Sequence, residues 1–226
     1  MIDAVRPVAD FLREHTDLLN GTIVRADVAV FLPFRRWLQT TDCAALKTAA
    51  ALTREHLQFR VISEENLAAA LANDAPSALI VESPSALATA ESATIENYKA
   101  HRGRVIWSEQ ENWLADLKPF PLSRTIVLNA PPTVRAVVRS KADKTIVHLF
   151  NLNVQKLSSF DDRVTPASDV RVQIQCAHSP HSVVALTSDP DATRGPLQFS
   201  ATQQKDAAAV TTTIPRLSIW SILIIE

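Results

Sequence analysis

Arginine, tryptophan and acidic side chains follow three short apolar runs in this chain of 226 residues. They are Arg35, Arg36 and Trp37, then Glu82, then Trp107 and Glu109. Guanidinium groups and carboxylates hydrogen-bond sugar hydroxyls, arginine also binds carboxylates bidentately, and an indole ring can cover the apolar face of a sugar. These residues predict a carbohydrate-binding or domain-docking edge. The alternative is that they are ordinary loop charges, with one of the two arginines paired to one of the two glutamates.

A nucleophilic enzyme is another interpretation of the same region. An amidotransferase-like triad places a cysteine on the turn after the third strand and a histidine downstream. Cys43 follows the first apolar run instead, which leaves Ser83 or Ser85 with His101. A degenerate amidotransferase-like hydrolase is therefore a hypothesis that the missing cysteine disfavours.

Histidines, cysteines and paired carboxylates have simpler structural explanations. His178 and His181 have no third metal ligand nearby, so we expect an exposed turn, and we expect no metal or cofactor. His148 lies in an apolar strand and is predicted to be a hydrogen-bonded histidine. The two cysteines, Cys43 and Cys176, are predicted to be free buried thiols. The carboxylate pairs that could perform acid/base work are Glu64/Glu65, Asp161/Asp162 and Glu109/Glu111. A helix N-terminus or a loop explains each of these pairs.

Composition excludes several classes of function. The chain has only three glycines, Gly21, Gly103 and Gly195, and no two are close in sequence. A phosphate loop, a dinucleotide-binding fingerprint and a G-x-S-x-G nucleophile elbow are therefore impossible. The net charge of −1 gives no electrostatic case for nucleic acid or an anionic membrane. No signal peptide or membrane span is visible, so the cytoplasm is the default expectation.

The first part of the chain alternates strand-like and helical patterns. Helices are expected at 3–19, from Thr41 or Asp42 to 56, from the cap Ser63 to 72, and at 90–101. Strands are expected at 27–32, 59–62, 77–81 and 104–107. This alternation predicts a parallel sheet with right-handed crossovers, most simply a flavodoxin-like, three-layer α/β domain. Ligands of such sheets bind beyond the carboxyl ends of the strands, where the six candidate residues fall.

The second part lacks helical periodicity and is richer in valine. Strands are expected at 125–128, 134–139, 145–151, 170–175, 182–186, 197–201, 208–212 and 218–225. Their spacing predicts an antiparallel β-sandwich, with Trp220 in its core. Leu117–Leu122 contains two prolines and is predicted to be a linker. The expected domains are therefore 1–122, with a leading helix at 1–20, and 123–226.

Several stretches resemble the region that follows the catalytic barrel in β-galactosidases of the trimerising type. They are Phe11–His15, Ala26–Val30, Phe59–Leu67, Ala78–Pro84, Val147–Asn151 and Ile214–Leu223. One departure is Arg102-Gly103-Arg104, where that family often has two adjacent glycines. The resemblance implies a glutamine-amidotransferase-like trimerisation domain followed by a small β-sandwich.

The resemblance also implies that the catalytic glutamates lie on a barrel, which needs about 250 residues of its own. We therefore expect no catalytic residue here, and either the part of an enzyme that follows the barrel or a stand-alone relative. The implied role is a non-catalytic accessory and oligomerisation module, with other copies or a barrel domain as partners. The alternative is a stand-alone carbohydrate-binding module that presents Trp37, Trp107 and Trp113.

Overall fold

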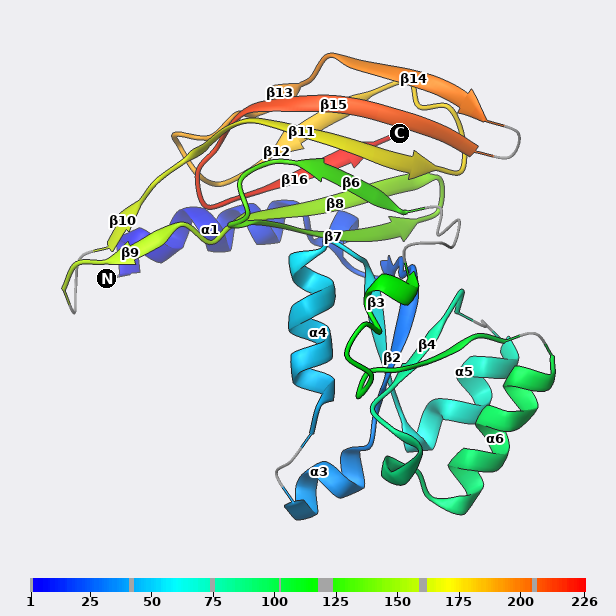
Figure 1. Cartoon of the computed structure of the whole chain (residues 1–226). Coiled ribbons are helices and arrows are strands. Elements are labelled where there is room, and N and C mark those ends of the chain that lie inside the picture. Colours follow the sequence, from blue (N-terminus) through cyan, green and yellow to red (C-terminus); the bar gives the residue numbers. More distant parts are fainter. Residues whose placement is uncertain are drawn as a thin grey trace. The chain divides into compact units, whose positions relative to one another are not determined.

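Two compact units make up the computed structural model, which describes residues 2–40, 43–73, 76–101, 103–117, 124–158, 162–204 and 207–226. Arg25–Thr125 form the α/β unit. Met1–Val24 and Ile126–Glu226 together form the sandwich unit. The chain leaves the sandwich unit after its first short strand and returns at its second, so the α/β unit is an insertion in the sandwich sequence (Figure 1).

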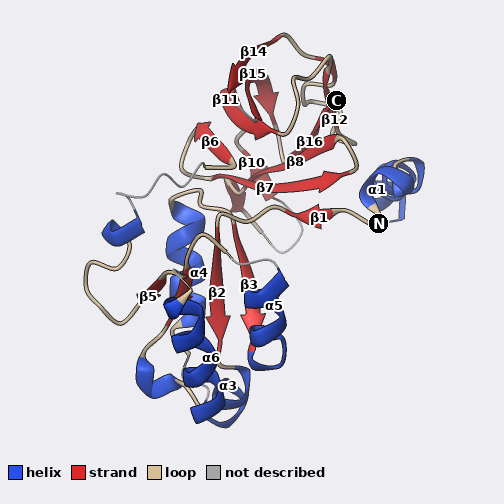
Figure 2. Ribbon diagram, turned by 90° about the vertical axis from the view of Figure 1, so that its right-hand side faces the viewer, coloured by secondary structure: helices blue, strands red, loops and turns tan. Residues whose placement is uncertain are grey.

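The α/β unit is built on a four-stranded parallel sheet (Figure 2). Its strands are β2 (Val28–Leu32), β3 (Phe59–Ser63), β4 (Leu79–Val81) and β5 (Val105–Trp107), in the order β3-β2-β4-β5. Its α-helices are α3 (Phe34–Thr40), α4 (Ala45–Arg54), α5 (Leu67–Asn73) and α6 (Thr89–Ala100). Three 3₁₀ helices, η1 (Glu64–Asn66), η2 (Pro84–Ala86) and η3 (Ala115–Leu117), complete the unit.

Alternation along the strands gives this sheet two buried faces. Val28 and Val30 of β2 belong to a cluster that includes Leu52 of α4. The intervening residue of β2, Ala29, belongs to a second cluster, which includes residues of α5 and α6. Because successive side chains of a strand point to opposite faces, helices cover both sides of the sheet. The unit therefore has three layers, and its two central strands, β2 and β4, are apolar throughout because both of their faces are covered.

The sandwich unit consists of two antiparallel sheets and a small hairpin. The six-stranded sheet contains β1 (Ile23–Val24), β7 (Val134–Lys141), β8 (Lys144–Asn151), β16 (Trp220–Ile225), β12 (Val183–Leu186) and β13 (Gly195–Pro196), in that order. The four-stranded sheet contains β14 (Phe199–Gln204), β15 (Ala207–Leu217), β11 (Ala167–Cys176) and β6 (Ile126–Asn129), in that order. The hairpin pairs β9 (Val154–Lys156) with β10 (Asp162–Val164).

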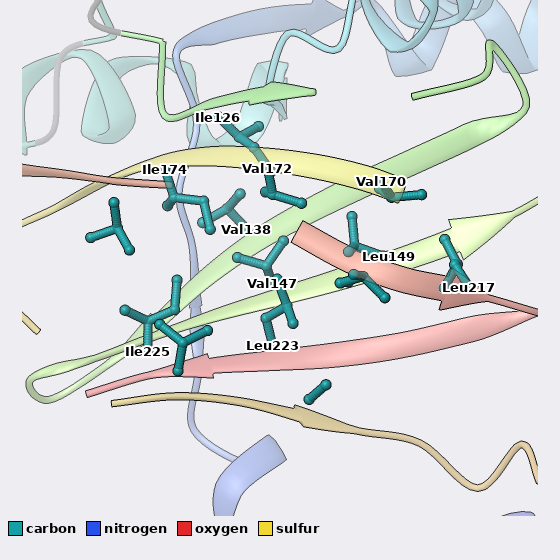
Figure 3. Close-up of a cluster of buried hydrophobic side chains, with 14 of the residues drawn as sticks. Ile126, Val138, Val147, Leu149, Val170, Val172, Ile174, Leu217, Leu223 and Ile225 are labelled. Atoms are coloured by element: carbon teal, nitrogen blue, oxygen red, sulfur yellow. The ribbon is translucent and has the colours of Figure 1, made fainter. Parts of the chain in front are cut away.

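The main core of the sandwich unit lies between its two sheets. Val147 and Leu149 of β8 come from one sheet, and Val172 and Ile174 of β11 come from the other (Figure 3). All four are fully buried. Burying a side chain of this size contributes about 1.5–3 kcal/mol, so the core is the main source of this unit's stability.

A second, smaller cluster covers the outer face of the six-stranded sheet. Phe11 of α1 (Ile2–Glu14) packs there against Ile146 of β8 and against Ile222 and Ile224 of β16. The short helix α2 (Thr16–Leu19) adds two leucines. Residues 1–20 were expected to belong to the first domain, whereas this cluster joins the leading helix to the sandwich unit. The apolar stripe of the helix predicted that it would bury one face, but not which sheet it would cover.

Most expected elements form within a few residues of their predicted bounds, with instructive differences. α3 forms where a loop was expected. Ser63 precedes η1 as predicted, but its side chain makes no capping hydrogen bond. Gly21 has a φ of +69° just after α2, a left-handed conformation that glycine adopts readily at a helix end. The predicted caps Thr41 and Asp42, and residues 118–122 of the predicted linker, lie outside the described residues.

Candidate functional site

The carboxyl edge of the parallel sheet holds the candidate residues. α3 follows β2, η1 follows β3, η2 follows β4, and a turn follows β5. Parallel strands end at the same edge, so this topology places the four connections side by side, as the sequence predicted.

Glu82 lies at this edge, and each of its two carboxylate oxygens is bound by another group of the protein. One carboxylate oxygen, Oε1, lies 2.7 Å from Nη1 of Arg36. The other oxygen, Oε2, accepts a hydrogen bond of 3.0 Å from the backbone N–H of Ala44. Only 12% of the Glu82 side chain is exposed. The carboxylate therefore links α3 and the start of α4 to the end of β4. Its ion pair with Arg36 is one of the arginine–glutamate pairings predicted if these residues are ordinary loop charges.

Arg35 and Glu109 are the exposed members of the candidate set. The backbone N–H of Arg35 donates a 2.8 Å hydrogen bond to Oε1 of Glu64, which joins α3 to η1. The backbone N–H of Glu109 donates to the carbonyl of Glu82 at 3.0 Å. Both residues are fixed through their backbones, so their side chains extend from a rigid edge.

The tryptophans at this edge do not form a common platform. Trp37 packs against the cluster that contains Val30, whereas Trp107 packs against the cluster on the opposite face of the sheet. Trp113 belongs with Trp37. All three rings are partly buried, so none offers a whole face to a sugar. Trp220, predicted to be sandwich core, lies instead in the outer-face cluster, at 5.0 Å from the ring of Phe11.

Exposed apolar side chains are the feature of this region that sequence reasoning missed. Phe34 is 41% exposed, Leu38 is 67% exposed, and Leu46, near the start of α4, is 63% exposed. Phe34 and Leu38 are four residues apart and therefore share one face of α3. That spacing was visible in the sequence, but the segment was expected to be a loop. We call these three residues the apolar crest.

The predicted pairing of Ser83 or Ser85 with His101 is wrong. Oγ of Ser83 and Oγ of Ser85 share a 2.7 Å hydrogen bond just before α6, and Ser83 is buried. His101 follows the opposite end of α6, where its Nδ1 lies 2.8 Å from the carbonyl of Asn97. A helix of 12 residues is about 18 Å long, so the imidazole cannot reach either serine.

Several remaining candidates agree with their structural interpretations, but no hydrogen bond of the His148 side chain, predicted to be hydrogen-bonded, is found among the described residues. His178 and His181 are exposed between β11 and β12, and both cysteines are buried free thiols. His148 is partly buried on the outer face of the six-stranded sheet, and desolvation, together with the charge of Arg139, lowers the pKa of its imidazole. Asp161 lies outside the described residues. In the part of the chain that the structure describes, no cluster of histidine, cysteine and acidic residues could hold a metal.

Comparisons with known proteins find a likeness to glycoside hydrolases in part of the chain. Residues 116–224 match the family model described as Glycosyl hydrolase family 66. This region, which contains most of the sandwich unit, is therefore glycoside-hydrolase-related. No curated protein matches the chain by sequence. Among the described residues, no helix combines the length and apolar character that a membrane span requires.

Solved structures extend the likeness to the fold of nearly the whole chain. The α-L-fucosidase isoenzyme 2 of Paenibacillus thiaminolyticus matches with a TM-score of 0.69 at 12% identity, over 96% of this chain. The match covers 51% of the fucosidase, so this chain spans about half the length of that enzyme. A cycloisomaltooligosaccharide glucanotransferase of Paenibacillus sp., in complex with cycloisomaltoheptaose, matches with a TM-score of 0.35 at 17% identity, over 44% of this chain and 16% of its own.

Proposed function

We propose that this chain is a non-catalytic accessory and oligomerisation module of a glycoside-hydrolase-like protein. The observation that carries the proposal is the extent of the fucosidase match: almost all of this chain corresponds in fold to about half of that enzyme. A catalytic barrel needs about 250 residues. The described residues form a four-stranded parallel sheet and an antiparallel sandwich instead. In the proposal, catalysis therefore belongs to a part of the parent protein that this chain lacks.

We propose that this chain is related to the region after the barrel in β-galactosidases of the trimerising type. The strand order of the α/β unit, β3-β2-β4-β5, is the order 2-1-3-4 in that unit's own numbering. This order supports a flavodoxin-like unit, because that class has the order 2-1-3-4-5. The absence of glycine at the carboxyl edge argues against phosphate chemistry there and favours a structural role.

The apolar crest is the proposed assembly surface. Phe34, Leu38 and Leu46 lie on a part of the α/β unit that Arg36, Glu64 and Glu82 hold in place. Exposed apolar side chains with charged side chains around them are typical of protein–protein interfaces. We propose that a second copy of this chain covers the crest, with Arg35 and Glu109 at the polar rim.

Carbohydrate binding by the six candidate residues has less support. Glu82 and Arg36 are paired with each other, and the two tryptophans lie on different faces of the sheet. These residues are better explained as the framework of a docking edge than as a sugar site.

An assay of purified chain against a panel of nitrophenyl glycosides tests the non-catalytic part of the proposal. We expect no hydrolysis above the buffer blank, whereas an active glycosidase assayed in parallel releases nitrophenol. Turnover that follows the protein peak through two purification steps would overturn the proposal. A fluorophosphonate probe that labels Ser83 or Ser85 would revive the hydrolase alternative.

A further inference from the structure

The outward face of the four-stranded sheet carries a groove that the proposed assembly role does not use. It is an open groove of about 610 Å³ beside β14, β15 and β11. Its volume is within the usual range for small-molecule sites, about 300–1,000 Å³. The groove lies in the glycoside-hydrolase-related region, residues 116–224.

Strand register explains the polar side chains on one part of the groove, whose lining also includes the apolar residues Leu197 and Phe199. Val210 and Ile214 of β15 point into the sandwich core, so the alternating residues Thr211 and Thr213 point outward. Thr211 pairs with Ser200 of β14, and Thr213 pairs with Arg171 of β11. Hydroxyl groups from two strands therefore stand in adjacent rows, next to one guanidinium group.

Arg171 gives the groove its charge. It is exposed, and among the described residues it has neither an ion-pair partner nor a hydrogen-bond partner. No acidic side chain is among the described residues that line the groove. The guanidinium group offers a planar fork of N–H donors that matches a carboxylate. The hydroxyl rows can donate and accept hydrogen bonds, and Pro196 and Pro215 add apolar ring carbons at the rim.

We infer that this groove binds a short oligosaccharide that carries a carboxylate. Arg171 binds the carboxylate bidentately, Ser200, Thr211 and Thr213 bind sugar hydroxyls, and the prolines contact the apolar face of a sugar ring. This role goes beyond assembly and does not depend on it, because the groove and the apolar crest lie in different units.

Calorimetric titration of the full chain with trigalacturonic acid, and with maltotriose as the neutral counterpart, tests the inference. We expect trigalacturonic acid to bind at millimolar concentration, and maltotriose to bind at least tenfold more weakly. Arg171→Gln should weaken binding of the acidic sugar about tenfold or more, since hydrogen bonds to charged groups contribute about 1.5–3 kcal/mol. Thr213→Val should weaken it less.

Arg163→Gln, an exposed arginine of β10 in the same unit, is the matched control and should bind as the wild type does. Arg171→Gln should keep the wild-type melting temperature, because the residue is exposed. Failure of trigalacturonic acid to bind, or unchanged binding by Arg171→Gln, would overturn the inference. Equal affinity for the two sugars would overturn the role given to the carboxylate. Because a monomeric chain can still bind the sugar, this test is independent of the assembly proposal.

Discussion

The α/β unit and the sandwich unit both fasten connecting segments with side-chain hydrogen bonds, but the apolar cores that these bonds supplement differ. In the α/β unit, carboxylates accept backbone N–H groups: Asp27 binds Gln58 and Thr125, and Glu91 binds Ala88. In the sandwich unit, the carboxylate of Asp189 accepts the backbone N–H of Ile219 at 3.0 Å, and the neutral amide of Asn151 binds two further segments. Its Nδ2 donates to the carbonyls of Thr165 and Ser218 at 2.8 Å.

The two units differ in how their apolar cores are divided. The α/β unit divides its apolar residues between two clusters, one on each face of a small sheet. The sandwich unit gathers most of its own into one cluster between two sheets. A carboxylate forms stronger hydrogen bonds than a neutral group does. We infer that individual polar anchors matter more in the α/β unit, and that continuous apolar packing matters more in the sandwich unit.

The largest expected effect is at Asp27, which closes the α/β unit where the chain enters and leaves it. Oδ1 accepts hydrogen bonds from the N–H and hydroxyl of Thr125, at 2.9 and 2.7 Å, and Oδ2 accepts one from the N–H of Gln58 at 3.1 Å. Asp27→Ala leaves these buried donors without an acceptor and should destabilise the α/β unit by about 4 kcal/mol. Urea unfolding followed by tryptophan fluorescence measures this, since three of the four tryptophans lie in that unit.

Glu65→Ala, an exposed carboxylate of the same unit, is the control and should change stability by less than about 0.5 kcal/mol. A similar small change for Asp27→Ala would show that its hydrogen bonds contribute little, and the contrast between the units would fail.

The next effect is at Phe11, which tests whether the leading helix stabilises the sandwich unit. The ring is 8% exposed and contacts Trp220 edge-on. Phe11→Ala should destabilise the sandwich unit by about 3 kcal/mol and leave the α/β unit unchanged. Hydrogen exchange should show lost protection in β16 but not in β2. Leu152→Ala, an exposed leucine of the sandwich unit, is the control; lost protection in β2 of the Phe11 variant would contradict the assignment of the helix.

A smaller effect is expected at Gly103, between α6 and β5. A Cβ atom there would overlap the ring of Tyr98. Gly103→Ala should therefore destabilise the α/β unit by about 2 kcal/mol. Adding Tyr98→Ala should remove the clash, so that the double variant is more stable than the sum of the two single changes predicts. Additive losses in urea unfolding would show that the close approach carries no strain.

The smallest effect concerns pH and the sandwich unit. Burial, with Arg139 nearby, lowers the pKa of His148, so the unfolded chain binds a proton more readily than the folded one. This contribution to stability is complete above the ordinary histidine pKa of about 6.5 and is lost as the pH falls below it. His148→Gln should flatten the fall in urea midpoint between about pH 7 and 5. His178→Gln, an exposed histidine, should not; an unchanged slope in the His148 variant would contradict the account.

Sequence reasoning predicted the strands well because their burial leaves a direct pattern. The run Val28–Leu32 is apolar throughout, as a parallel strand covered on both faces requires. The run Trp220–Ile225 is nearly as apolar, but it was assigned to an ordinary sandwich strand. Its missing alternation was the signal that α1 covers its second face.

The candidate site was predicted only in part, because side-chain pairing depends on distances that the sequence does not contain. The topology correctly gathered Arg36 and Glu82 at one edge. The 2.7 Å contact between Arg36 and Glu82 decides between a sugar-binding edge and ordinary paired loop charges. Phe34 and Leu38 of the apolar crest were missed because α3 is a single short helix of seven residues, too short to show a clear period.

The central claim, assembly through the α/β unit, is tested most directly by light scattering during size-exclusion chromatography. A single chain has a mass of 24.8 kDa, and we expect the wild type to elute with a multiple of that mass. The double change Leu38→Asp and Leu46→Asp should give the single-chain mass without loss of folding. Leu152→Asp, a leucine of the sandwich unit that is 60% exposed, should leave the assembly intact. A wild-type chain that stays at 24.8 kDa at the highest concentration reached, or an assembly that the double change leaves intact, would contradict the account.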